Sequence, residues 1–192
     1  MGRGGCVPLK RTSKGQLCSL VPRHVFYTPI VKTPLALGAT HQYCCVVPIP
    51  DFNAEGNLPP GIHEADWAEF KTRFGTTGHR RHLIKGLEEA MRSLRTAGCS
   101  RLYIDGSFVT SEKSPKDFDA CWEETGVDPN RLEPVFFDLR PPRAIQKARF
   151  GGELFPASAP ADGRSMFVDF FQRTRGGQAK GIVTIDLKGW QP

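Results

Sequence analysis

The residues with the clearest chemical potential lie in the stretch RLYIDGSFVTSEKSPKDFDACWE, which starts at Arg101. It contains a Gly-Ser pair, Gly106 and Ser107, and two aspartates, Asp117 and Asp119, that are separated by one phenylalanine. Residues two apart in a β-strand point to the same side, so a strand over DFDACW would place both carboxylates on one face. Two carboxylates this close repel each other, and a divalent cation would relieve the repulsion. Such ligands suit Mg²⁺ or Mn²⁺, and a pair of these metals about 4 Å apart can hold the attacking and leaving oxygens of a phosphoryl displacement.

The residues around this motif predict the elements that must position it. Alternation over 101–105 predicts a strand, Gly106 permits a tight turn, and Ser107 would begin a helix, SFVTSEK, whose free N–H groups could seat a phosphate. Upstream, apolar residues at a spacing of three and four predict two helices, a short one in the stretch from His63 that Gly75 ends and a longer one over 79–97.

The side chains of these two helices have simpler explanations than ligand binding. The aromatic stripe Trp67, Phe70 and Phe74 is expected to pack on the core rather than to stack on bases. His79 and His82 have no third ligand nearby, so a solvated helix end is a better interpretation than a zinc site, although the adjacent arginines could bind an anion.

The Gly-Ser turn after one strand, followed about ten residues later by an acid-x-acid motif on the next, resembles the DNA polymerase β-type nucleotidyltransferase superfamily. The segments IPDFNAEGNLPPGIHEADW, HRRHLIKGL, KARFGGELFPA and KGIVTIDL also resemble a family of small bacterial and phage proteins allied to the minimal nucleotidyltransferases. The resemblance covers roughly residues 47–188. It implies an α+β fold, a small mixed β-sheet with helices packed on one face.

The resemblance also implies roles for the motif residues. Gly106 and Ser107 would bind the phosphates of a nucleoside triphosphate such as ATP, and Asp117 and Asp119 would bind two Mg²⁺ or Mn²⁺ ions. The implied reaction is transfer of a nucleoside monophosphate to a protein or RNA acceptor, including tRNA. Minimal members commonly act in toxin–antitoxin or phage-defence pairs, so the implied partner is a cognate toxin or antitoxin.

In that superfamily a third carboxylate, on a later strand, completes the metal and catalytic site. We predict Asp169 in SMFVDFFQ, on a strand that would form a hairpin with KGIVTIDL. Asp186 within that last segment is the second candidate. Asp138 is the third, since its surroundings look more helical. The alternative for Asp169 is a short helix that leaves its carboxylate at a solvent edge.

Cations for a triphosphate are expected between Asp138 and Glu153, where no acid occurs. Arg140, Arg143 and Lys147 recur at a spacing of three and four, which would make a basic helical stripe. We select Lys147 and Arg149 as nucleotide or RNA contacts. The alternative is an ordinary solvated face.

The 192-residue chain has enough apolar residues, 39%, to form a core, and no apolar stretch long enough to cross a bilayer, so we expect no membrane contact and a cytoplasmic location. The net charge of +6 lies entirely before Asp51, the first acid; the remainder carries 20 basic and 20 acidic residues. The basic charge is therefore weak evidence for a nucleic-acid partner. Six cysteines without CxxC spacing are expected to be reduced thiols.

The domain prediction follows from this charge distribution. Residues 1–46 are interpreted as a basic, poorly ordered extension, either a stretch translated ahead of the true start or a transit peptide, and 47–192 as the nucleotidyltransferase-like domain. Two alternatives to an enzyme stay open. The fold could serve as a binding or regulatory module without turnover, or Ser107 could merely cap a helix while Asp117 and Asp119 solubilise a strand end.

Overall fold

The computed structural model describes residues 48–192, so the prediction for 1–46 lies outside the described residues. Within this range the strands are β1 (Gly61–Glu64), β2 (Arg101–Asp105), β3 (Phe118–Trp122), β4 (Gly152–Pro156) and β5 (Gly181–Asp186). The α-helices are α1 (Trp67–Phe74), α2 (Gly78–Thr96), α3 (Ala144–Phe150) and α4 (Phe167–Phe170), and there are two 3₁₀ turns, η1 (Ser107–Val109) and η2 (Pro134–Phe137). No helix in this part of the chain is long and apolar enough to span a membrane.

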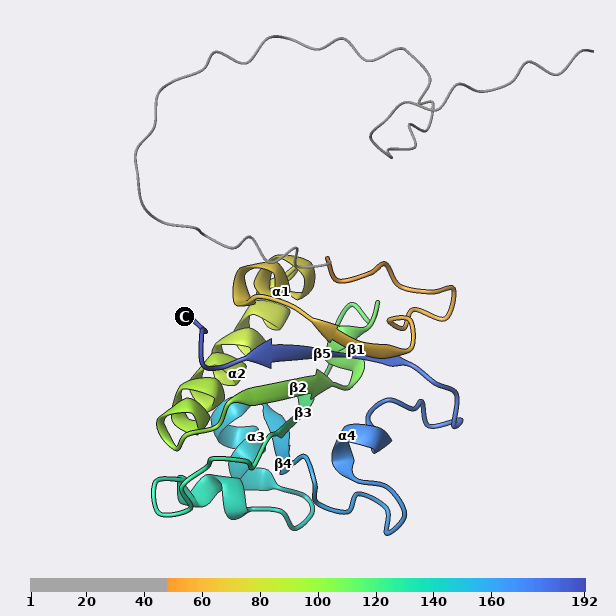
Figure 1. The fold of residues 1–192 in the computed structure, drawn as a ribbon. Coiled ribbons are helices and arrows are strands. Elements are labelled where there is room, and N and C mark those ends of the chain that lie inside the picture. Colours follow the sequence, from red (N-terminus) through yellow and green to blue (C-terminus); the bar gives the residue numbers. More distant parts are fainter. Residues whose placement is uncertain (1–47) are drawn as a thin grey trace, which may run out of the picture. The chain divides into compact units, whose positions relative to one another are not determined.

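The five strands form one mixed sheet in the order β1-β5-β2-β3-β4 (Figure 1). The outer pairs, β1 with β5 and β3 with β4, are parallel, and β2 runs antiparallel to both of its neighbours. The chain passes from β3 to β4 through η2 and α3, which is the long crossover that a parallel pair requires.

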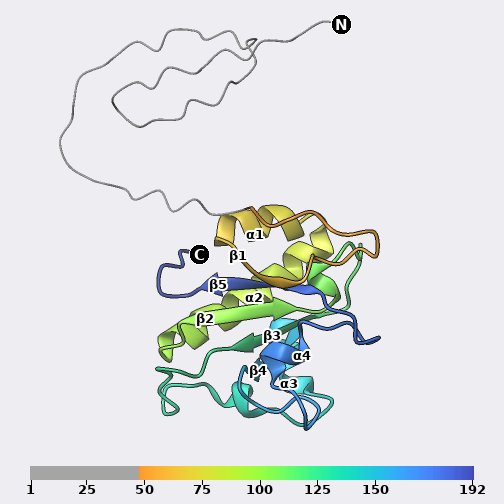
Figure 2. The same cartoon turned by 45° about the vertical axis from the view of Figure 1, so that its right-hand side comes forward.

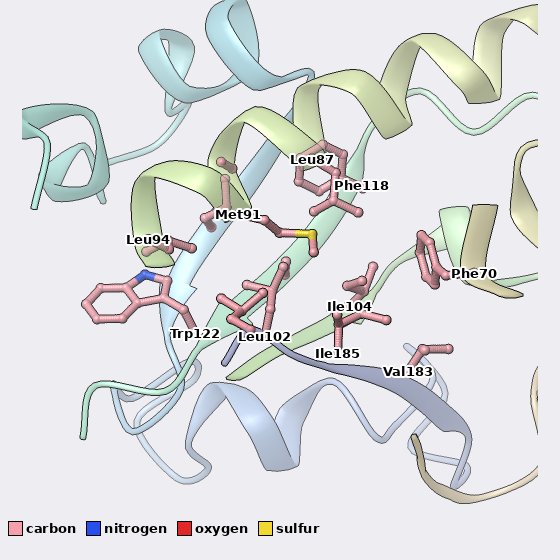
Figure 3. Packing of buried hydrophobic residues seen from close by; sticks show 14 of the residues in the cluster. Phe70, Leu87, Met91, Leu94, Leu102, Ile104, Phe118, Trp122, Val183 and Ile185 are labelled. Carbon is pink, nitrogen blue, oxygen red and sulfur yellow. The ribbon is translucent and has the colours of Figure 1, made fainter. Parts of the chain in front are cut away.

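One face of the sheet packs against α1, α2 and α3. Leu87, Met91 and Leu94 of α2 lie over Leu102, Ile104 and other strand residues, as Figure 3 shows. The predicted helices are confirmed. Asp66 caps the start of α1 by accepting the Glu69 N–H, and both predicted apolar stripes are buried. The predicted aromatic stripe is core and not a stacking surface.

The opposite face carries a smaller cluster, in which Phe167 and Phe171, in and just after α4, pack on Phe155 of β4. Figure 2 shows α4 and α2 on different sides of the sheet. The prediction of a small mixed sheet is therefore confirmed, but helices cover both faces and not one. The strand predicted for SMFVDFFQ is also wrong, because its aromatic side chains pack on Phe155 from one turn of helix.

Candidate functional site

Carboxylates from three neighbouring strands stand in one row at the same end of the sheet. Asp105, the last residue of β2, is the register partner of Asp119 in β3, and Asp119 is the partner of Glu153 in β4. Directly paired residues point to the same side, which here is the face opposite α2. Local sequence spacing does not reveal this row, because Glu153 reaches it only through the β3–β4 pairing.

Asp117 joins the row from just before β3 and is held by a lysine. The Nζ atom of Lys147, on α3, lies 2.9 Å from Asp117 Oδ2 and 2.8 Å from Glu153 Oε1. Arg143 adds a second cation, with its Nη1 2.9 Å from Glu153 Oε2 and its guanidinium 4.6 Å from the centre of the Phe155 ring. Lys147, predicted as a nucleotide contact, is thus in the site, where it bridges two acids.

Among residues 48–192, Asp119 is the member of the row that has no counter-ion of its own. Lys147 bonds to Asp117, and Lys180 bonds to Asp105. Burial and the charges of Asp117, Asp105 and Glu153 together raise the pKa of Asp119 to about 7, whereas Lys147 acts in the opposite direction. A carboxylate in this state would be stabilised by a proton or by a cation.

Asp105 and Lys180 form a buried ion pair at the β2 end of the row. They are only 6% and 9% exposed, respectively. Burial raises the pKa of Asp105, and the ammonium of Lys180 opposes this shift. This pair fixes the end of β2 next to the segment that leads into β5, and it leaves Asp105 less free than Asp119 to bind anything else.

Gly106 brings the backbone against Asp119. Its φ of 81° is a conformation that glycine adopts without strain, and a Cβ atom there would lie 2.6 Å from Asp119 Oδ2. Ser107 follows on the surface and begins η1, so the predicted helix SFVTSEK is a single 3₁₀ turn. The structure thus brings Gly106 and Ser107 beside the two predicted aspartates. Because η1 is a single turn, it has no long helix dipole that could stabilise a phosphate there.

Arg80 of α2 holds the loop that follows this turn. It is 3% exposed, and its guanidinium donates hydrogen bonds to four backbone carbonyls, those of Phe74, Phe108, Thr110 and Glu112. His79 contributes a contact of 2.6 Å between its Nε2 and the carbonyl oxygen of Pro115. The expectation of a solvated, anion-binding helix end is therefore wrong for Arg80, because its donors are already used by the Gly-Ser loop.

The structure does not bring the predicted third carboxylates into the row. Asp169 is exposed on α4, and Asp138 accepts a hydrogen bond from the N–H of Ile145 at the start of α3. Asp186 is the register partner of Arg101, the first residue of β2, whereas Asp105 is the last. Four residues of strand, at about 3.3 Å each, separate those two ends by about 13 Å. Glu153 is a carboxylate on a later strand, β4, and it is the register partner of Asp119.

The predicted basic residues do not form one stripe along a helix. Arg140 lies before α3 and is exposed, so it does not continue a helical stripe with Lys147. Arg149 pairs with Glu89 and Glu133, two acids outside the row. The structure therefore gives Arg149 a contact between α3 and α2 rather than a place beside Asp119.

Sequence reasoning missed Glu153 and Arg80. All three candidates for the third carboxylate were aspartates, so Glu153 was omitted. The segment GGELFP, which follows the basic segment, alternates as a strand does and contains this glutamate. Arg80 offers no comparable signal, since an arginine in the first turn of a helix is ordinarily exposed.

The donor set has the chemistry that a hard divalent cation prefers, with the carboxylates of Asp117, Asp119 and Glu153 on neighbouring strands. As the side chains lie here, no three His, Cys, Asp or Glu side chains of residues 48–192 form a group that could hold a metal ion. The ammonium of Lys147 stands between two of the three carboxylates. These residues therefore fit a divalent cation on the condition that Lys147 moves away.

The fold and site together define a mixed α/β domain with a carboxylate row at the ends of three strands and a glycine turn packed against it. The chain belongs to the DUF6932 family, described as a family of unknown function, whose model matches residues 50–186. The match includes every residue of the row. No curated protein and no solved structure matches the chain.

Proposed function

We propose that this protein is a metal-dependent nucleotidyltransferase that transfers a nucleoside monophosphate from a nucleoside triphosphate to a protein or RNA acceptor. The observation that carries the proposal is the position of Asp119. This carboxylate has a raised pKa, is the register partner of Glu153 in β4, and lies against the backbone of Gly106 at the end of β2. A glycine turn in contact with a carboxylate that has no counter-ion of its own within residues 48–192 supports the binding of a metal–nucleotide complex there.

In this proposal Asp117, Asp119 and Glu153 hold Mg²⁺ or Mn²⁺. The metal would neutralise charge on the phosphates and on the attacking oxygen. Glu153 replaces Asp169 as the third carboxylate, because it is the acid on the strand next to Asp119. Ser107 and the first amides of η1 would contact the phosphates. These amides have no hydrogen-bond acceptor inside so short a turn.

We assign Lys147 two successive roles, one before and one after a metal binds. In the structure it pairs with Asp117 and Glu153, and if a cation bound these carboxylates instead, its ammonium would be free to bind a triphosphate oxygen. Its side chain is 41% exposed, so this movement does not require the core to open. Arg143 stays with Glu153 and orients it.

We extend the proposal to the acceptor and the location. The acceptor is a protein or a tRNA-like RNA, with a cognate toxin or antitoxin as the partner implied by the resemblance to minimal nucleotidyltransferases. The location is the cytoplasm, where triphosphates and Mg²⁺ are abundant. The free thiols of Cys99 and Cys121 are compatible with a reducing compartment.

A binding module without turnover is the second candidate, and one specific observation favours it. Lys147, Arg143 and Lys180 already neutralise three of the four carboxylates. A row that is balanced by the protein's own cations could serve as a structural network, in which case no metal enters.

The test is nucleotide transfer. The protein is incubated with each α-³²P-labelled triphosphate, Mn²⁺ or Mg²⁺, and cell extract, and labelled protein and RNA are separated on gels. We expect a labelled product with the native protein and none with Asp119→Asn or Glu153→Gln, while Asp169→Asn keeps the native level. Absence of label with every triphosphate, together with absence of nucleotide or metal binding, would favour the binding module.

A further inference from the structure

A hollow lies along the other edge of the sheet, beside β1. It encloses about 870 Å³, and its wall includes five consecutive residues, 62–66, with Trp67, Trp190 and three prolines. Successive side chains of a strand point to opposite faces, so a hollow that touches every residue of this run follows the strand edge rather than one face. Its volume is in the range of ordinary ligand pockets. We call this hollow the β1 groove.

The backbone beside the β1 groove has hydrogen-bonding groups that point outward. Within residues 48–192, β1 pairs with β5 alone. Ala65 donates its N–H to the carbonyl of Thr184 in β5, and because backbone groups alternate, the amides of Ile62 and Glu64 point away from β5. Ile62 is also 45% exposed. A free strand edge next to an apolar hollow is where an extended peptide adds as a further strand.

The charge of the β1 groove selects the kind of peptide. Glu64, Asp66 and Asp186 line it, and no lysine or arginine of the described chain does. None of the three acids forms an ion pair within residues 48–192, although Asp66 caps α1 and Asp186 accepts the Lys188 N–H. The wall also includes the apolar rings of Trp67 and Trp190. An occupant must therefore bring both positive charge and apolar side chains.

We propose that the β1 groove binds an extended segment of another protein in which lysine or arginine alternates with apolar residues. The segment pairs with the outer edge of β1 through the backbone groups of Ile62 and Glu64. Its apolar side chains lie against the tryptophans, and its cations face Glu64 and Asp186.

This site is separate from the carboxylate row. The row is built on β2, β3 and β4, whereas the groove lies on β1 and the carboxyl end of β5. The proposal therefore does not depend on the proposed transferase activity, and each can fail without the other.

The test mixes the full chain with fluorescein-Val-Lys-Val-Arg-Val-amide, labelled at its N-terminal amine so that Lys and Arg keep their charges, and follows binding by fluorescence anisotropy. A peptide with Glu and Asp in place of Lys and Arg tests the charge requirement. A basic peptide that is N-methylated at alternate amides tests the backbone pairing. The protein variants are Glu64→Lys and the matched control Glu55→Lys, which reverses the charge of an exposed turn residue outside the groove.

We expect saturable binding of the basic peptide, weakened about fivefold or more by Glu64→Lys and unchanged in Glu55→Lys. The acidic and the N-methylated peptides should bind at least about fivefold more weakly, and backbone amide NMR signals of Ile62 and Glu64 should shift on binding. Absence of binding by the native protein would overturn the proposal. So would equal binding of the basic and acidic peptides, or equal loss in both variants. Unchanged affinity on N-methylation would reject the strand addition.

Discussion

Replacing Lys147 by methionine should tighten the binding of Mn²⁺ to the carboxylate row. In the native protein a cation that enters between Asp117 and Glu153 must first displace the ammonium of Lys147, which is paired with both at 2.9 and 2.8 Å. Methionine keeps most of the length of the side chain but cannot compete for the carboxylates.

The magnitude follows from the two ion pairs. Lys147 and Asp117 are both about a third exposed or more, and pairs of this kind contribute about 0.5 kcal/mol each. Losing both therefore removes about 1 kcal/mol of competition, which corresponds to about fivefold tighter binding of Mn²⁺. Triphosphate binding should change in the opposite direction, because the freed ammonium is the proposed phosphate contact.

The assay is a titration of free Mn²⁺ by electron paramagnetic resonance at pH 8 and low salt. Lys85→Met is the matched control, since Lys85 is an exposed lysine on α2 that makes no ion pair within the described chain. It should bind Mn²⁺ as the native protein does, and Asp119→Asn should lose the site. An affinity in Lys147→Met equal to or below that of the native protein would refute the competition between ammonium and metal.

Three further predictions concern stability and reactivity. Because the pKa of Asp119 is raised to about 7, its contribution to stability is fully present below about pH 4 and is lost as pH rises through 7. Asp119→Asn should therefore stabilise the protein in urea unfolding at pH 8, by about 2–4 kcal/mol, and have little effect at pH 4; an equal effect at both values would contradict this. Arg80→Met leaves four carbonyls without their donor, so calorimetry should show a loss of about 3 kcal/mol, or about 6–12 °C in Tm; an unchanged Tm would show that the loop does not need this arginine. Burial raises the pKa of Cys99 to about 11, and Cys121 is buried too. Mass spectrometry after iodoacetamide treatment at pH 8 should therefore find both thiols unmodified until the protein is unfolded. Rapid labelling of either thiol in the folded protein would contradict their burial.

The sequence pattern predicted those helices and strands whose apolar periodicity is visible within a single segment. The strand 101–105 and the long helix were predictable because alternation and a spacing of three and four persist over enough residues to identify them. The proximity of Gly106 to Asp119 was also predictable, since β2 and β3 are consecutive strands that pair, joined by residues 106–117.

The remaining features depend on contacts between segments far apart in the sequence. SMFVDFFQ is apolar on both sides of Asp169 and fits a strand or a helix, and the packing of Phe167 on Phe155 favours the helix. Glu153 reaches Asp119 through a parallel pairing whose register no local pattern contains. Burial of Arg80 depends on four carbonyls, three of which lie about 30 residues away.

In the proposed enzyme, Asp117, Asp119 and Glu153 together hold a metal ion beside a nucleotide bound at the Gly106 turn. The most direct measurement is an anomalous difference map from crystals grown with Mn²⁺ and an α,β-methylene nucleoside triphosphate. We expect a manganese peak bonded to Asp117, Asp119 and Glu153, a phosphate next to the Gly106 turn, and the ammonium of Lys147 displaced toward that phosphate. A map without manganese at the row, in which Lys147 still bridges Asp117 and Glu153, would contradict it.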